Sequence, residues 1–280
     1  MDQNHPYLVP LRASGSRSPL FCLPGAAFHD MVTLIHDDQP VYSVDTEKFI
    51  EPKKSFSVQE LAEFCRRIIC QRQGDGPYYL CGYSFGGFVA YEIAAQLANE
   101  GKEIGLLALF DSLNPNFERS ITKSLQFRVA YLGDRFRKYG RNLLLGKFDE
   151  LMIDALAFLG TQAGKIPALV IQSAFRKLNR PLPEVIWHND PRIEAAMRAY
   201  NPPPYGQRLV LFRSQARGPE YDNHLDLGWS MCASGEIDVH SVPGIHAKMM
   251  ATPNIDAAWK TLIAYLEADA DCRTVREPTE

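Results

Sequence analysis

The sequence predicts an α/β fold in which helices cover both faces of a mostly parallel sheet. Short apolar runs alternate with segments of helical periodicity before residue 114 and again after about residue 208. Between them, residues 115–190 contain helix-like segments and no convincing strand. One strand-to-helix corner, "CGYSFGG", carries a serine flanked by glycines. Since strand–helix alternation is typical of parallel βαβ units, we expect an α/β sheet interrupted by a helical insertion.

The expected strands are apolar runs bounded by turn residues, and the expected helices repeat apolar residues at i, i+3, i+4 and i+7. One helix opens with Ser57 and Glu60 at capping-box spacing. The expected strands are 20–23, 40–45, 78–82, 103–111, 208–214 and 236–244, and the expected helices are 57–69, 85–99 and 254–268. Residues 1–18 are polar and predict an N-terminal linker, so 19–114 and 191–280 form the expected core and 115–190 the helical lid insertion.

Composition is that of a globular protein, with 46% hydrophobic and 22% charged residues. The net charge of −3 gives no global signal for nucleic acid. The first residues lack the pattern of a signal peptide, and no apolar run approaches the roughly 20 residues of a membrane span. Six scattered cysteines without a Cys-x-x-Cys pair favour free thiols over disulfides or a metal site. We therefore expect a cytoplasmic protein that binds neither membrane nor nucleic acid.

Ser84 lies at the corner between an expected strand and an expected helix, within Gly82-x-Ser84-x-Gly86. This pattern is weak alone, but with a strand before it and a helix after it, it fits a nucleophile elbow. The turn is tight enough that side chains at the flanking positions would collide with backbone. It places the serine hydroxyl at a helix N-terminus, where developing negative charge is favoured.

A nucleophilic serine needs a base, and the base needs an orienting acid. The expected chain order is serine, acid, histidine. We predict His246 as the base because "VPGIHAKMM" follows the last expected strand, and loops at the carboxyl ends of parallel strands collect functional groups. His224 is the alternative.

For the acid we predict Asp111, which ends the strand that directly follows the elbow helix. The rival position lies after the next strand, where Arg213, Ser214 and Gln215 include no acid. Asp222 and Asp226 come later and remain alternatives.

Acyl transfer also needs an oxyanion hole of N–H donors. The N–H of Phe85, directly after the serine, is one expected donor. The other is expected in the loop after an early strand, where "LPGAA" offers the N–H of Gly25 or Ala26.

Over nearly its whole length after about residue 7, the chain resembles the α/β-hydrolase thioesterases of polyketide and non-ribosomal peptide synthesis, most closely the type I domain at the end of a megasynthase. The resemblance runs through "LFCLPGAA", "GPYYLCGYSFGGFVAYEIAAQL", "LLALFDS", "YNPPPYGQRLVLFRS" and "VHSVPGIHAKMM". Asp111 stands at the acid position usual for this family. The histidine block often reads Gly-Asp-His in the family, whereas Ile245 precedes His246 here.

The resemblance implies the α/β-hydrolase fold and a thioesterase that releases an acyl or peptidyl chain from the phosphopantetheine arm of a carrier protein. Release would pass through an acyl-serine and end in hydrolysis or macrocyclisation. It implies no cofactor or metal in the enzyme itself. The alternatives are a free-standing type II editing thioesterase, a general serine esterase or lipase, and a catalytically silent scaffold that only binds a carrier or ligand.

The insertion differs in charge from the rest of the chain. Residues 115–190 hold 12 Lys or Arg and 7 Asp or Glu, a net charge of +5 in a chain whose total is −3. Because carrier proteins are usually acidic, we hypothesise that arginines such as Arg128, Arg135 and Arg137 steer the carrier partner. Solvated helix faces explain the same charges equally well.

Overall fold

The computed structural model describes residues 5–122, 190–217 and 224–274. The chain divides into two compact units, one made of 1–118 and 196–280, the other of 119–195. Helices occur at the two edges of the predicted insertion, α4 (Pro115–Thr122) and α9 (Pro191–Ala199). Residues 123–189, with the arginines expected to steer a carrier, lie outside the described residues, so the helical lid stays a prediction.

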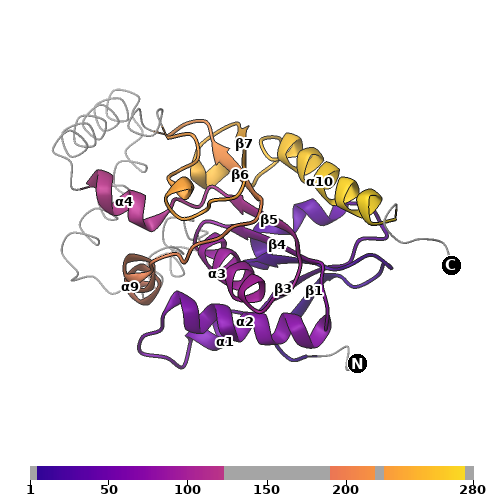
Figure 1. Cartoon of the computed structure of the whole chain (residues 1–280), viewed down its shortest axis with the longest axis horizontal. Coiled ribbons are helices and arrows are strands. Elements are labelled where there is room, and N and C mark those ends of the chain that lie inside the picture. Colours follow the sequence, from indigo (N-terminus) through magenta and orange to yellow (C-terminus); the bar gives the residue numbers. More distant parts are fainter. Residues whose placement is uncertain (1–4, 123–189, 218–223, 275–280) are drawn as a thin grey trace, which may run out of the picture. The chain divides into compact units, whose positions relative to one another are not determined.

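Seven strands form one sheet, which confirms the predicted fold class (Figure 1). In chain order they are β1 (Leu8–Arg12), β2 (Leu20–Leu23), β3 (Val41–Val44), β4 (Tyr78–Tyr83), β5 (Ile104–Phe110), β6 (Leu209–Ser214) and β7 (Ile237–Val242). Their order across the sheet is β1-β3-β2-β4-β5-β6-β7. Every neighbouring pair is parallel except β1 and β3.

The expected linker over 1–18 is wrong in part, because Leu8–Arg12 forms β1. This strand pairs antiparallel with β3, with Leu8 opposite Val44 and Arg12 opposite Val41. Its residues are exposed or only half-buried, so the sequence carries no buried apolar run that would indicate this strand. Hydrogen bonds to β3 at the edge of the sheet, rather than core burial, hold this strand.

The three predicted helices begin within two residues of their predicted starts. The main ones are α2 (Val58–Arg72), α3 (Phe85–Asn99) and α10 (Asp256–Thr274), and a single turn, α1 (Glu47–Ile50), was not predicted. The capping box at α2 is complete: the Ser57 side chain accepts the N–H of Glu60, and the Glu60 carboxylate accepts the N–H of Ser57. No helix in the described part of the chain is long and apolar enough to cross a membrane.

Helices cover both faces of the sheet. Figure 1 shows α2 and α3 together on one side and α10 on the other. Buried residues surround α3 on nearly all sides, because it lies between the sheet and α2. On the α10 side, Phe110 stacks on Phe212 at 4.4 Å between ring centroids and contacts Phe28 and Trp259. Because helices bury both faces of the sheet, polar groups are left to the loops at the ends of the strands.

The strand order brings several loops to one edge. Because β2 to β7 are parallel, the loops after β2, β4, β5, β6 and β7 leave from the same carboxyl-terminal edge. The chain passes from β2 outward to β3 and returns to β4 on the other side of β2. Such a switch in strand order is where open α/β sheets bind their ligands. Ser84 and the Pro24-Gly25 loop follow the two strands at this point.

We expect Ser57→Ala to lower the free energy of unfolding by about 1 kcal/mol, because it removes the side-chain cap of α2. Urea unfolding measures the change. Ser55→Ala, at an exposed serine two residues earlier, is the matched control and should change stability by less than about 0.5 kcal/mol. Equal effects of the two substitutions would contradict the role of the capping box.

Candidate active site

Ser84 occupies a strained corner between β4 and α3. Its φ of 54° lies in the left-handed region, which a residue with a side chain rarely adopts. Two contacts fix this backbone: its N–H donates to Phe110 O at 2.9 Å, and its carbonyl accepts the Ser112 hydroxyl at 2.8 Å. The neighbouring strand β5 therefore holds the corner in place.

The glycines beside Ser84 are required by close backbone packing, as the sequence predicts. A Cβ at Gly82 would collide with the backbone of Gly86 and Gly87. A Cβ at Gly86 would collide with the carbonyl of Leu23 and lie 2.8 Å from Pro24 Cδ. The first turn of α3 is thus pressed against the end of β2, which a larger residue would push away.

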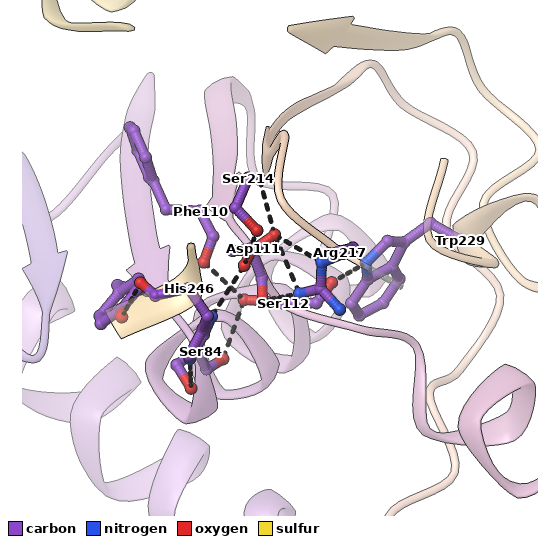
Figure 2. Close-up of polar contacts among 9 residues, drawn as sticks. Ser84, Phe110, Asp111, Ser112, Ser214, Arg217, Trp229 and His246 are labelled. Atoms are coloured by element: carbon purple, nitrogen blue, oxygen red, sulfur yellow. Dashed lines mark hydrogen bonds and ion pairs between the residues drawn. The ribbon is translucent and has the colours of Figure 1, made fainter. Parts of the chain in front are cut away.

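The structure brings Ser84, His246 and Asp111 together from three distant segments (Figure 2). His246, the first residue of the 3₁₀ turn η5 (His246–Lys248), lies with Nε2 3.1 Å from Ser84 Oγ. Its Nδ1 lies 2.8 Å from Asp111 Oδ2. Since an ionised carboxylate only accepts hydrogen bonds, Nδ1 carries the proton and Nε2 is free to accept the serine hydroxyl. This arrangement can take a proton from Ser84 while Asp111 balances the positive charge on the ring.

Asp111 is buried and ionised. Burial alone raises its pKa, but the hydrogen bond from His246, the positive charge of Arg217 and the Ser214 N–H together lower it to about 2. Ser214 donates twice, from N to Oδ1 at 2.9 Å and from Oγ to Oδ2 at 2.7 Å. Arg217 donates from Nε to Oδ1 at 3.0 Å. A carboxylate with these donors keeps its negative charge at any physiological pH.

Tyr83 holds the segment that carries His246. Its hydroxyl donates to His246 O at 2.8 Å, and the two rings stack with centroids 5.0 Å apart. Ile245, which stands where the family that this chain resembles often has an aspartate, is 48% exposed. In this chain the contacts from Tyr83 and Asp111 therefore orient the imidazole.

The predicted oxyanion donors lie on neighbouring segments. Phe85 opens α3, and the first N–H groups of a helix lack a partner within the helix. Gly25 and Ala26 open the 3₁₀ turn η1 (Gly25–Phe28), directly after the Leu23-Pro24 segment that packs on Gly86. The two predicted sources of N–H groups thus belong to segments in contact.

The alternative residues have other partners. His224 is exposed, and its ring lies 4.5 Å from that of Phe117. The Asp226 carboxylate accepts the N–H groups of Gly228 and Ser230. Asp222 lies outside the described residues. Among the described residues, no group of three or more His, Cys, Asp or Glu side chains could hold a metal ion.

Sequence reasoning missed Arg217, Tyr83 and the role of Ser214. In the sequence Ser214 is only a non-acidic residue at the end of an expected strand, and Arg217 stands in an irregular stretch three residues beyond β6. Tyr83 adjoins the serine within the elbow motif, but its ring contact is with a residue 163 positions away. No spacing rule reports a contact across that distance.

Comparisons with known proteins identify the relatives of this chain. A family described as "Thioesterase domain" matches residues 18–266. "Probable non-canonical nonribosomal peptide synthetase (NRPS) CymA" of Salinispora arenicola is 28% identical, covering 95% of this chain and 3% of the relative. "Malpibaldin synthetase" of Mortierella alpina is 26% identical, and the match covers 95% of this chain and 4% of that relative. The chain therefore spans only a few per cent of the length of these relatives.

Solved structures of thioesterase domains share the fold. The NocB thioesterase domain, in covalent complex with a fluorophosphonate nocardicin G analogue, aligns with a TM-score of 0.59 at 18% identity, over 93% of this chain and 99% of that one. The Vlm2 thioesterase domain, bound with a dodecadepsipeptide, aligns with a TM-score of 0.60 at 18% identity, over 91% and 96%. At this identity the likeness establishes the α/β-hydrolase fold alone.

The depressed pKa of Asp111 makes stability depend on pH. The folded-state pKa of about 2 lies below the ordinary 3.8, so the stabilisation is fully present above about pH 4 and is lost as pH falls from 4 to 2. The shift corresponds to about 2 kcal/mol. We expect the difference in unfolding free energy between wild type and Asp111→Asn to shrink by about that amount between pH 5 and pH 2, measured by urea unfolding.

The fully exposed Asp37 supplies the matched control for this experiment. The difference between wild type and Asp37→Asn should stay within about 0.5 kcal/mol over the same pH range. If the difference for Asp111→Asn is equally constant, Asp111 is not stabilised as an anion in the folded protein.

We expect Gly86→Ala to lower the free energy of unfolding by about 1–3 kcal/mol, because its Cβ has no room beside Leu23 and Pro24. Gly74→Ala is the control, since a Cβ there meets nothing within 4 Å. Chemical denaturation of both variants measures the difference. A Gly86→Ala protein as stable as Gly74→Ala would show that the elbow is not closely packed.

Proposed function

The chain belongs to the thioesterase domain family, and we propose that it releases an acyl, polyketide or peptidyl chain from the phosphopantetheine thioester of a carrier protein through an acyl-serine intermediate. One observation carries the serine mechanism. Asp111, His246 and Ser84 form an unbroken series of hydrogen bonds of 2.8 and 3.1 Å that ends at a hydroxyl on a strained corner. This is the arrangement of nucleophile, base and orienting acid that acyl transfer uses.

In the proposed first step, Ser84 Oγ attacks the thioester carbonyl carbon while His246 Nε2 takes the hydroxyl proton. The carbonyl π electrons move to oxygen and give a tetrahedral oxyanion. Asp111 keeps the imidazole oriented and balances its positive charge. The tetrahedral species then collapses, the C–S bond breaks, and the thiolate receives the proton from His246. The products are an acyl-serine and the free phosphopantetheine thiol.

The oxyanion needs donors where its charge develops. We assign this role to the N–H of Phe85 together with the N–H of Gly25 or Ala26. Supporting this, the loop that carries Gly25 and Ala26 begins at Pro24, which packs on Gly86 in the first turn of α3. The N-terminus of α3 adds a favourable dipole at the same place. Loss of one such donor typically costs about 10²–10³ in rate.

The acyl-serine has two possible acceptors. Water, deprotonated by His246, gives a carboxylic acid, and a hydroxyl or amine of the acyl chain itself gives a macrocycle. Both use the same three residues, so the choice depends on how water and the bound chain reach the ester. The proposed chemistry needs no cofactor, because Ser84, His246 and Asp111 provide the nucleophile, the base and the orienting acid.

The proposed partner is an acyl or peptidyl carrier protein. Its support is the kind of relative that the chain matches, since one of them is a nonribosomal peptide synthetase by name and a second is a synthetase by name. A carrier delivers its thioester on a phosphopantetheine arm, and the proposed release step needs the sulfur of that arm as leaving group.

The test is mass spectrometry of products from a panel of acyl-pantetheine thioesters, with Ser84→Ala beside wild type. We expect wild type to free thiol and to yield an acid or a lactone. We expect Ser84→Ala to lose at least about 10³-fold in rate, because the nucleophile is gone. Ser55→Ala, an exposed serine outside the site, should turn over like wild type.

The product mass separates hydrolysis from cyclisation. Turnover of oxygen esters in excess of thioesters would favour a general esterase instead. An unmodified Ser84 after treatment with a serine-reactive fluorophosphonate, together with no turnover of any ester, would favour a binding scaffold and overturn the proposal.

A further inference from the structure

Arg217 binds the carboxylate that orients the proposed base. Its Nε lies 3.0 Å and its NH2 group 2.9 Å from Asp111 Oδ1, and the same NH2 group donates to the Asp111 backbone carbonyl at 3.2 Å. The side chain of Arg217 is 13% exposed and that of Asp111 0%. Figure 2 shows the guanidinium beside Asp111, on the side away from His246. This is a mostly buried ion pair in which two guanidinium nitrogens converge on one carboxylate oxygen, and one of them also reaches the backbone carbonyl.

The two oxygens of Asp111 divide their partners. Oδ2 accepts from His246 Nδ1 and from the Ser214 hydroxyl, whereas Oδ1 accepts from Arg217 and from the Ser214 N–H. A carboxylate whose one charged neighbour is an imidazole stabilises the protonated ring with its full negative charge. Here a second, permanent positive charge, the Arg217 guanidinium, lies beside the other oxygen of Asp111. Because charges a few ångströms apart interact strongly where water is excluded, this cation offsets part of the field at His246.

Arg217 also fixes the position of Asp111. Asp111 has a φ of 50°, so its backbone is strained. The guanidinium contacts both its side chain and its backbone carbonyl, and it comes from the loop that follows β6. A lysine at this position would bring one ammonium group in place of the planar fork and could not reproduce the pair of contacts.

We propose that Arg217 is a positioning residue of the reaction: it holds Asp111 in place and limits how strongly that carboxylate stabilises the protonated imidazole of His246. This inference rests on the proposed function, in which His246 must be unprotonated to accept the Ser84 proton. Arg217 thereby keeps the base in its working form at lower pH than Asp111 alone would.

In the part of the chain that the structure describes, the other polar groups beside His246 include a hydroxyl, a phenol and a lysine. Ser84 lies at Nε2, Tyr83 stacks on the ring, and Lys248 stands exposed in the same 3₁₀ turn. None of these three side chains is a carboxylate or a second imidazole, the kinds of group whose ordinary pKa falls near the acidic end of the pH range tested. In a profile of reaction rate against pH, a shift of the acidic limb on substituting Arg217 would therefore report on the Asp111–His246 pair.

The test measures the rate at which a fluorophosphonate modifies Ser84 in the full chain between pH 5 and pH 9. For Arg217→Gln we expect the midpoint of the acidic limb to move to higher pH by about 0.5–1 unit, because the offsetting cation is lost. We expect the plateau rate to fall about tenfold, because Asp111 is less well held. Arg217→Lys should keep its midpoint within about 0.3 unit of wild type while its plateau rate falls.

The matched control is Arg208→Gln. Arg208 also pairs with an aspartate, Asp238, but it stands just before β6, at the opposite end of the strand from the site. Neither its midpoint nor its plateau rate should differ from wild type.

If the midpoint of the acidic limb lies at the same pH in Arg217→Gln and in wild type, the proposal is overturned, whatever the plateau rate. Circular dichroism checks folding. If Arg217→Gln unfolds, Arg217→Met replaces it, since its side chain keeps much of the apolar contact of the arginine stem. If both neutral variants unfold, Arg217→Lys decides, and an unchanged plateau rate overturns the proposal.

The labelling reaction needs no thioester, so the two proposals can fail separately. A chain that labels at Ser84 with the expected shift but releases no thiol from any thioester contradicts the thioesterase function alone. A chain that turns over thioesters with an unshifted limb in Arg217→Gln contradicts the role of Arg217 alone.

Discussion

The buried carboxylate of Asp111 is the interaction on which the arrangement of the site depends. Removing a charge from water costs several kcal/mol unless hydrogen-bond donors replace the lost water. Here the donors are Ser214 at the end of β6, Arg217 in the loop beyond it and His246 in η5. These residues lie 103 to 135 positions from Asp111 in the sequence. One charge therefore ties three segments to the end of β5, and any displacement of them leaves the carboxylate without its donors.

Backbone strain is the second constraint, and the sheet supports it. Ser84 and Asp111 both have positive φ, which costs of order 1–3 kcal/mol at each residue. Their N–H groups donate to Phe110 O at 2.9 Å and to Phe212 O at 2.7 Å, so each strained residue is bonded to the neighbouring strand. The reacting groups thus project from a rigid edge, and their separation is fixed before any substrate arrives.

Most of the fold could be predicted because its elements carry local signals. Buried parallel strands appear as short apolar runs, and α2 begins with a capping box at Ser57 that is fully formed. β1 was missed for a physical reason. It is an edge strand with little burial, so its stability comes from hydrogen bonds to β3, which leave no pattern in its own residues.

For the site, the sequence by itself determined the chemical groups and their order along the chain. The glycines around Ser84 predict the tight corner, because only glycine fits where two backbones meet. Tertiary structure alone decided the contacts that no motif indicates. The sequence favoured His246 over His224, but only the fold brings His246 to Ser84, places Arg217 beside Asp111 and stacks Tyr83 on the imidazole. Motifs record constraints within a few residues, whereas a hydrogen bond between distant segments depends on how the whole sheet brings their ends together.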